Sequence, residues 1–458
     1  MSEIHGSPAR VLIANRGEIA LRIIRAAHSI GWEAVAVFSD VDEDARWVEL
    51  ADDAVHIGAS PATKSYLNID AIISAAKSSG CTYVHPGYGF LAERPEFSRR
   101  VAESGLTFVG PAANVIEEMG DKALARRTAE RAGVPIVPGT EVLSGVEAAA
   151  AAAEDLGYPV LVKASAGGGG KGTRVVADAD ELREVIPAAQ AEARSAFGDP
   201  AIYLEKAVLD ARHIEVQILG DTHGNVIHVF ERDCSVQRRR QKLIEEAPAP
   251  GLAPHLREAI TSAAVRLVAE IGYEGAGTVE FIVDGEEFYF IEMNTRIQVE
   301  HPITEEISGI DLVAEQLHIA AGRQLSVAQE DITIQGAAIQ FRINAENPQQ
   351  DFFPSPGTLT AFDPPGGPGV RVDAGVVAGG EVPPYYDSLV AKIIVHGRDR
   401  EAALARGAQA LSELHIDGIL TTRDLHLELL RAADLRNGPV TTNWLENTWL
   451  PKSFPDSM

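Results

Sequence analysis

The sequence predicts a succession of α/β and α+β domains. A chain of 458 residues is too long for one hydrophobic core. Its N-terminal part has the pattern strand, turn, helix, strand, which is typical of a parallel sheet. A stretch rich in proline and glycine, Asp351–Gly369, precedes a last part with the pattern of short strands and turns. Hydrophobic and charged contents of 45% and 23% are those of a globular protein.

The N-terminal unit is justified by its hydrophobic periodicity. Val11–Ala14 and Ala34–Phe38 are short apolar runs, and the isoleucines within residues 19–24 recur at helical spacing. Between the first run and the helix lies the turn Asn15–Gly17, whose single glycine is not a full dinucleotide-binding fingerprint. Tyr83–Glu93, which follows another predicted strand, contains a Gly-Tyr-Gly turn.

Composition along the chain suggests where the later domains lie. A boundary is expected near Gly110–Lys122, and a small α+β segment from about Ala132. The alanine run Ala148–Ala153 predicts an exposed helix. A larger segment continues to about Gly322, and the C-terminal part is expected to hold one helix, Arg400–Leu414.

Charge and composition exclude several classes of function. A formal charge of −26 argues against a nucleic-acid-binding protein, which needs a basic face. No apolar run reaches the length of a membrane span, and the N-terminus lacks the pattern of a signal peptide. Cys81 and Cys234 form neither a disulfide framework nor a metal-binding motif. We therefore expect a cytoplasmic protein that binds neither nucleic acid nor membrane.

A glycine-rich stretch, "VKASAGGGGKG", is the first candidate binding element. Gly167–Gly170 leave backbone N–H groups free of side-chain cover, which suits phosphate oxygens. Lys163 and Lys171 add positive charge on either side. The spacing is not that of a P-loop, so a strand–loop–strand hairpin over a nucleotide is the favoured interpretation. A flexible surface turn is the alternative.

Two carboxylates and an amide form the second candidate site. Val279–Val283 and Phe288–Met293 have the pattern of strands, joined by a turn at Asp284-Gly285. Glu280 and Glu292 then face each other across a hairpin, and Asn294 shares the face of Glu292. These hard oxygen donors suit Mg²⁺ that carries nucleotide phosphates. A polar outer face is the alternative, but it leaves Glu280 in an apolar strand unexplained.

Further polar residues follow the hairpin. Arg296, Gln298 and Glu300 continue its alternation; Arg296 offers a planar fork for a small anion and Glu300 a proton acceptor. On spacing alone they are equally compatible with solvated side chains.

Two further groups of cations stand out in this acidic chain. Arg238, Arg239, Arg240 and Lys242 form a basic cluster, for which anion binding at an active site is favoured over nucleic-acid binding. Arg342 lies in an apolar strand, where a structural ion pair is the commoner role.

Taken together, these motifs resemble the biotin carboxylase family of ATP-grasp ligases. The resemblance covers nearly the whole chain and rests on these stretches: "LIANRGEIALRIIRAA", "HPGYGFLAE", "MGDK", "VKASAGGGGKG", "RHIEVQ", "RDCSVQRR", "EMNTRIQVEHP", "FRINAE" and "PYYDSLVAKI". It implies a Rossmann-like N-terminal domain (1–118), an ATP-grasp domain (119–325, with a lid at about 132–208) and a mixed β/α C-terminal domain (335–446).

The resemblance also implies roles for individual residues. ATP contacts would come from Lys122, Lys163, Gly167, Gly168, Gly169, Gly170, Glu205, Lys206, Val208, His213, Gln237 and Arg240. Mg²⁺ or Mn²⁺ would be held by Glu280, Glu292 and Asn294. Bicarbonate would be bound by Lys242, Arg296, Gln298 and Val299. Glu300 would be the general base, Arg342 would stabilise the biotin enolate, and Tyr88 would help to position biotin.

The implied reaction is the carboxylation of biotin through carboxyphosphate, with ATP and bicarbonate as co-substrates. No biotinylation motif or carboxyltransferase region is found in the sequence. We therefore expect two separate partners, a carboxyltransferase subunit and a biotin carboxyl carrier protein. A homodimer is expected by resemblance. Another ATP-grasp carboxylate–amine ligase, or a non-catalytic nucleotide-binding regulator, are the competing hypotheses.

Four positions depart from the usual pattern of the family. Arg240 stands where histidine is common, Ala166 replaces a glycine, Thr173 replaces a methionine, and Phe341 is bulkier than usual. We expect an active enzyme whose affinity for the nucleotide is altered.

Overall fold

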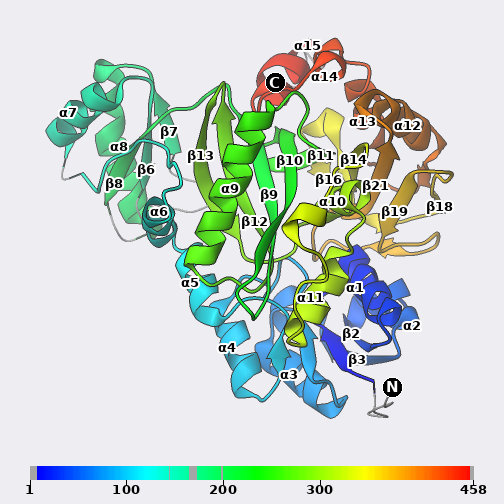
Figure 1. Ribbon diagram of the computed structural model, residues 1–458. Coiled ribbons are helices and arrows are strands. Elements are labelled where there is room, and N and C mark those ends of the chain that lie inside the picture. The colour runs from blue at the N-terminus through cyan, green and yellow to red at the C-terminus, as the bar shows by residue number, and fades with distance from the viewer. Residues whose placement is uncertain (1–7, 144, 165–172, 198–199, 454–458) are drawn as a thin grey trace.

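The N-terminal part of the computed structural model is a five-stranded parallel sheet (Figure 1). The model describes residues 8–143, 145–164, 173–197 and 200–453. The strand order β3-β2-β1-β4-β5 is that of a Rossmann-like fold. The predicted strand–turn–helix–strand unit is confirmed as β1, α1 and β2, whereas the strand expected before Tyr83 is Tyr83–His85 itself. The elements are β1 (Arg10–Ile13), α1 (Gly17–Ser29), β2 (Glu33–Ser39), α2 (Arg46–Leu50), β3 (Asp53–Gly58), α3 (Ile69–Ser78), β4 (Tyr83–His85), α4 (Pro95–Glu103), β5 (Thr107–Phe108) and α5 (Ala113–Gly120).

A small three-stranded sheet covered by two helices forms a separate lobe, drawn in teal in Figure 1. The predicted strand–loop–strand hairpin is confirmed, since Lys163 pairs with Thr173 in antiparallel register. The glycines between them, with Ala166 and Lys171, lie outside the described residues. The elements are α6 (Lys122–Arg131), α7 (Val146–Leu156), β6 (Val160–Ala164), β7 (Thr173–Val176), α8 (Ala179–Phe197) and β8 (Ile202–Lys206).

The alanine run is not simply exposed, contrary to the sequence-based expectation. Ala149, Ala150 and Ala153 are buried in the core of the small lobe, together with Val160 and Leu204. Small side chains let a helix approach its neighbours closely, so one alanine face forms the core while the other faces solvent.

The central and C-terminal parts share one eight-stranded antiparallel sheet. Its order is β13-β12-β9-β10-β11-β14-β21-β19, so β11 of the central part pairs directly with β14 of the C-terminal part. Helix α9 covers one face of the central strands (Figure 1). The central elements are β9 (Arg212–Gly220), β10 (Val226–Arg238), β11 (Gln241–Ala247), α9 (Pro254–Glu270), β12 (Gly275–Asp284), β13 (Glu287–Asn294), α10 (His301–Ser308) and α11 (Leu312–Ala320).

The C-terminal part contains more helix than the sequence predicted. The expected helix is confirmed as α12, but α13, α14 and α15 also form, and β21 is a nine-residue strand of the large sheet rather than a short one. The elements are β14 (Ala337–Asn344), β15 (Glu346–Asn347), β16 (Phe353–Pro354), β17 (Gly357–Thr358), β18 (Ala361–Asp363), β19 (Val370–Ala374), β20 (Glu381–Val382), β21 (Leu389–Gly397), α12 (Arg400–Glu413), β22 (His415–Asp417), α13 (Arg423–Leu429), α14 (Ala433–Asn437) and α15 (Leu450–Ser453). Among the described residues, none of the helices combines the length and the apolar character of a membrane span.

Candidate active site

The β12–β13 hairpin brings the predicted carboxylates together. Glu280 lies opposite Glu292, and Thr278 lies opposite Asn294, in antiparallel register. The Asn294 amide donates to Glu280 Oε1 at 3.1 Å. Glu292 has no hydrogen-bond or ion-pair partner among the described residues, and burial, followed by the charge of Glu280, raises its pKa. A half-buried carboxylate without a partner fits the coordination of a divalent cation, so the donor set suits Mg²⁺ or Mn²⁺.

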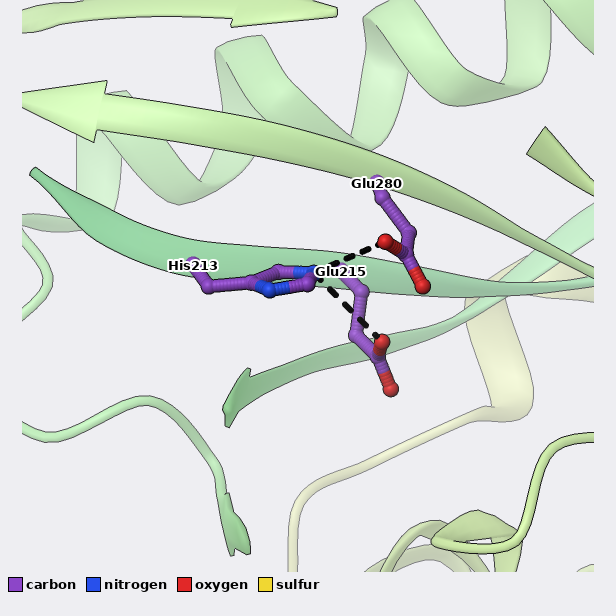
Figure 2. Close-up of side chains that lie close together, drawn as sticks. All are labelled: His213, Glu215 and Glu280. Carbon is purple, nitrogen blue, oxygen red and sulfur yellow. Dashed lines mark ion pairs between the residues drawn. The ribbon is translucent and has the colours of Figure 1, made fainter. Parts of the chain in front are cut away.

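Strand β9 adds two side chains to this carboxylate pair (Figure 2). His213 Nε2 lies 3.0 Å from Glu280 Oε2 and 4.0 Å from Glu215 Oε2. Burial alone would lower the pKa of His213, but Glu280 raises it above its ordinary value. Glu215 is not among the residues predicted for the site. The alternation His213, Glu215, Gln217 in an otherwise apolar strand was the available signal.

Lys242 is the cation at the centre of the site. Its ammonium group lies 2.6 Å from Glu215, 3.1 Å from Glu280 and 2.6 Å from Glu300. Burial alone would lower its pKa, but the three carboxylates raise it well above the usual range. Lys242 therefore remains charged and links the carboxylates of β9 and β12 to Glu300.

Glu300 stands at the start of α10 and is fully buried. It accepts hydrogen bonds from Lys242 at 2.6 Å and from Arg342 Nη2 at 3.0 Å. Burial alone would raise the pKa of this carboxyl group, but Lys242 and Arg342 lower it well below its ordinary value. Glu300 is thus an anion whenever both cations face it.

Arg342 projects from β14 towards Glu300. Its Nε donates to Glu245 at 2.6 Å, so the guanidinium group bridges two fully buried carboxylates. The ion pairs expected of a lone arginine in an apolar strand are therefore present. They also place Arg342 at the site.

Arg296 and Gln298 point to the same group of residues. Arg296 Nε donates to Glu93 at 2.8 Å, its Nη2 contacts Asn294 Oδ1, and Gln298 Nε2 donates to Glu280 at 2.9 Å. They are therefore not solvated side chains. Glu93 was quoted within a motif but was not recognised as a partner of Arg296.

The basic cluster is divided by the turn that joins β10 and β11. Arg239 and Arg240 occupy left-handed conformations at φ 46° and 66° in this turn. Arg238 and Arg239 pair with Asp351, whereas Lys242 points into the carboxylate cluster. The four cations therefore do not gather at one point, and Lys242 is the one that lies among the carboxylates of the candidate site. Arg240 is exposed at the turn, and Gln237 is buried opposite Lys242.

The residues expected to contact ATP come from several elements around the small lobe and the central sheet. Lys163 forms an ion pair with Glu205, which also accepts from Arg126 at 2.8 Å. Lys206 Nζ donates to the Gly157 carbonyl at 2.9 Å, and Val208 follows β8 in a loop. Lys122 begins α6 and lines a cavity of about 210 Å³ together with Glu292 and Asn294.

Tyr88 lies apart from the carboxylate cluster. Its hydroxyl donates to Glu18 of α1. Burial, followed by the charge of Glu18, raises the pKa of Tyr88 well above its usual range, while the nearby Arg342 opposes this. Tyr88 is therefore a neutral hydroxyl.

Comparisons with known proteins agree along nearly the whole chain. Family models match residues 7–116 (biotin carboxylase, N-terminal domain), 121–328 (carbamoyl-phosphate synthase L chain, ATP binding domain) and 340–447 (biotin carboxylase C-terminal domain). Biotin carboxylase 1 of Bacillus subtilis is 52% identical over 440 residues, covering 95% of this chain and 98% of the relative. The biotin carboxylase of Pseudomonas aeruginosa is 53% identical over 439 residues, with the same two coverages, 95% and 98%.

The solved structures agree with the sequence relatives. The biotin carboxylase domain dimer of Hydrogenobacter thermophilus 2-oxoglutarate carboxylase, in complex with MgADP, ADP and bicarbonate, is 48% identical. It superimposes with a TM-score of 0.90 over 98% of this chain and 99% of that one. The chain belongs to the biotin carboxylase family.

Proposed function

We propose that this protein carboxylates biotin, using ATP and bicarbonate, and releases N-carboxybiotin, ADP and phosphate. One observation carries the proposal: Lys242 contacts Glu280 and Glu300 at the same time. One proposed metal ligand, Glu280, and the candidate general base, Glu300, therefore share one cation. A site of this kind can activate bicarbonate next to the nucleotide and pass the product towards Arg342.

The nucleotide half of the site supplies charge compensation. A divalent cation held by Glu280, Glu292 and Asn294 would neutralise charge on the triphosphate. Lys122 and Lys163 add positive charge on either side. For Lys163 this requires that its ammonium group leave Glu205 for a phosphate oxygen. Glu205, Lys206 and Val208 then border the adenine, and His213, Gln237 and Arg240 the ribose and phosphates.

The bicarbonate half holds a small anion and removes its proton. Arg296, Gln298, Lys242 and the Val299 N–H are the proposed ligands. When Lys242 and Arg342 turn towards substrate anions, they withdraw stabilisation from the Glu300 carboxylate and its pKa rises. Glu300 then accepts the bicarbonate proton, and the resulting oxyanion attacks the γ-phosphorus as ADP leaves.

The last step transfers the carboxyl group to biotin. Carboxyphosphate breaks into CO₂ and phosphate, and this phosphate takes the N1 proton of the ureido ring. Arg342 stabilises the negative charge that develops on the ureido oxygen, and N1 attacks CO₂. Tyr88 contacts Glu18, which pairs with Lys392, the residue opposite Arg342 in the sheet, and this arrangement supports the placement of biotin near both.

The proposed partners follow from this reaction. Biotin would arrive on a separate biotin carboxyl carrier protein, and a carboxyltransferase subunit would use the N-carboxybiotin. A homodimer is proposed as well, since the Hydrogenobacter relative is described as a dimer.

An ADP-release assay tests the function. ADP formation should require bicarbonate, and free biotin should increase it. A carboxylate–amine ligase would respond to neither addition, and a nucleotide-binding regulator would release no ADP. Either of these results would overturn the proposal.

A substitution at Glu292 tests the metal ligands. Glu292→Gln keeps the shape of the side chain and removes a charge that forms no ion pair with a described residue, so we expect the protein to fold normally. Loss of one charged ligand should raise the Mg²⁺ concentration for half-maximal ADP release by roughly tenfold or more. The measurement is a titration of free Mg²⁺ at saturating ATP. An unchanged midpoint would remove Glu292 from the metal site.

A further inference from the structure

A fully buried lysine lies where three parts of the chain meet. Lys392 is on β21 of the C-terminal part, and its side chain is 0% exposed. Its ammonium group lies 2.9 Å from Glu18 Oε2, on α1 of the N-terminal part. It also donates to the Val299 carbonyl at 3.0 Å, in the turn between β13 and α10. A buried ammonium group is costly unless it is paired, so these contacts fix its position.

The turn that Lys392 contacts carries three of the proposed bicarbonate-site residues: Gln298, Val299 and Glu300. Its second anchor is His301, whose Nδ1 lies 2.7 Å from the Gln298 carbonyl. Burial, followed by the charge of Lys392, lowers the pKa of His301 well below its usual value, so the ring is neutral and Nδ1–H donates. Because a peptide unit is planar, anchoring both carbonyls fixes the two peptide planes on either side of the Val299 Cα.

The other contact of Lys392 leads to the biotin side of the site. Glu18 Oε2 forms the ion pair with Lys392, and Glu18 Oε1 accepts a hydrogen bond from the Tyr88 hydroxyl. Lys392 also lies directly opposite Arg342 in the antiparallel register of β14 and β21. Residues directly opposite in such a pair lie on the same face of the sheet. One ammonium group therefore connects the bicarbonate turn with Tyr88 and stands beside Arg342.

We propose that Lys392 is a positioning residue, which holds the Val299 carbonyl so that the 298–300 turn keeps the geometry that binds bicarbonate, and which ties this turn to Tyr88 through Glu18. The inference rests on the proposed function. Lys392 touches no substrate, so it acts only through the groups it holds. A displacement of about 1 Å in such groups can lower turnover by about 100-fold.

The test uses the double variant Glu18→Gln/Lys392→Met in the full chain. Lys392→Met alone would leave a buried carboxylate without its cation and could prevent folding. The added Glu18→Gln removes that charge and leaves an oxygen that still accepts from Tyr88. The double variant therefore removes the Val299 contact without leaving Glu18 charged and unpaired. Asp373, which lies 3.8 Å from Lys392, keeps its ion pair with Arg371.

The expected result is that the KM for bicarbonate changes and the KM for ATP does not. The KM for bicarbonate should rise by about tenfold or more, while the KM for ATP stays within about twofold of the parent. Amide exchange should also increase in a peptide covering residues 298–305, where the His301 and Ile303 amides bond to carbonyls of the turn. A purely structural role would lower melting temperature and kcat without this difference between the two Michaelis constants.

A matched pair elsewhere provides the control. Arg400 likewise bridges a carboxylate, Glu246, and a backbone carbonyl, that of Leu435. Glu246→Gln/Arg400→Met should leave the KM for bicarbonate within about twofold of the parent. An unchanged KM and unchanged exchange at 298–305 in the folded Lys392 variant would overturn the proposal. If the parent shows no bicarbonate-dependent turnover, the proposed function fails, and amide exchange alone decides whether Lys392 holds the turn.

Discussion

Glu300→Gln should lower bicarbonate-dependent ADP release by roughly 10²- to 10⁴-fold, the usual contribution of a general base. Glutamine has the same shape but cannot take the bicarbonate proton. The fold should survive, because Lys242 still forms ion pairs with Glu215 and Glu280, and Arg342 still forms one with Glu245. The measurement is kcat at saturating ATP and bicarbonate, with melting temperature recorded alongside.

Glu231→Gln is the control for this variant. Glu231 is fully buried on a strand of the same sheet and pairs with Arg257 at 2.8 Å, away from Lys242. The substitution makes the same chemical change as Glu300→Gln, and we expect the kcat of the Glu231→Gln variant to stay within about threefold of the parent. Retention of more than a tenth of parental activity by Glu300→Gln would exclude Glu300 as the base.

Arg342→Met should separate the two halves of the reaction. Biotin carboxylation should fall by roughly 10²- to 10³-fold, the effect of removing one oxyanion-stabilising donor. Bicarbonate-dependent ADP release without biotin should fall much less, because Lys242, Arg296 and Gln298 still hold bicarbonate. The two rates are measured in parallel, as N-carboxybiotin formed and ADP released.

Two further observations sharpen the Arg342 prediction. Arg342→Lys keeps the charge but cannot bridge Glu245 and Glu300 through a planar fork, so it should recover only part of the lost rate. Loss of Arg342 also removes one of the cations that keep the Glu300 pKa low. Glu300 must be ionised to accept a proton, so the acid limb of the ADP-release profile should move to higher pH. Equal loss of both rates in Arg342→Met would contradict a specific role on biotin.

Local pattern predicted the parts of the site that lie within one hairpin. Period-two alternation put Glu280, Glu292 and Asn294 on one hairpin, but the turn alone does not set their pairing. A β-bulge shifts the register between the Phe281–Phe290 pair and the Glu280–Glu292 pair, and this shift brings the two carboxylates directly opposite each other. Arg296, Gln298 and Glu300 lie beyond the end of β13, in the turn before α10, so the predicted continuation of the strand alternation does not account for their places in the site.

Contacts between distant strands could not be predicted in this way. Glu215 reaches Lys242 because β9 and β11 flank β10, a long-range arrangement that no local pattern records. Lys392 reaches Val299 across a gap of 93 positions in the chain. The division of the basic cluster could not be predicted either, because Lys242 points inwards after the turn, whereas Arg238 and Arg239 pair with Asp351, which lies over a hundred positions away. The motifs of the family resemblance supplied the roles that periodicity alone could not.

The most direct test of the account follows an oxygen atom of bicarbonate. If bicarbonate oxygen attacks the γ-phosphorus, cleavage of carboxyphosphate leaves that oxygen on phosphate. With bicarbonate labelled with oxygen-18, and a turnover fast relative to its exchange with water, the account predicts one labelled oxygen in each phosphate released. Phosphate without label, formed at the same rate as ADP, would show that water attacks the nucleotide, and would contradict the central claim.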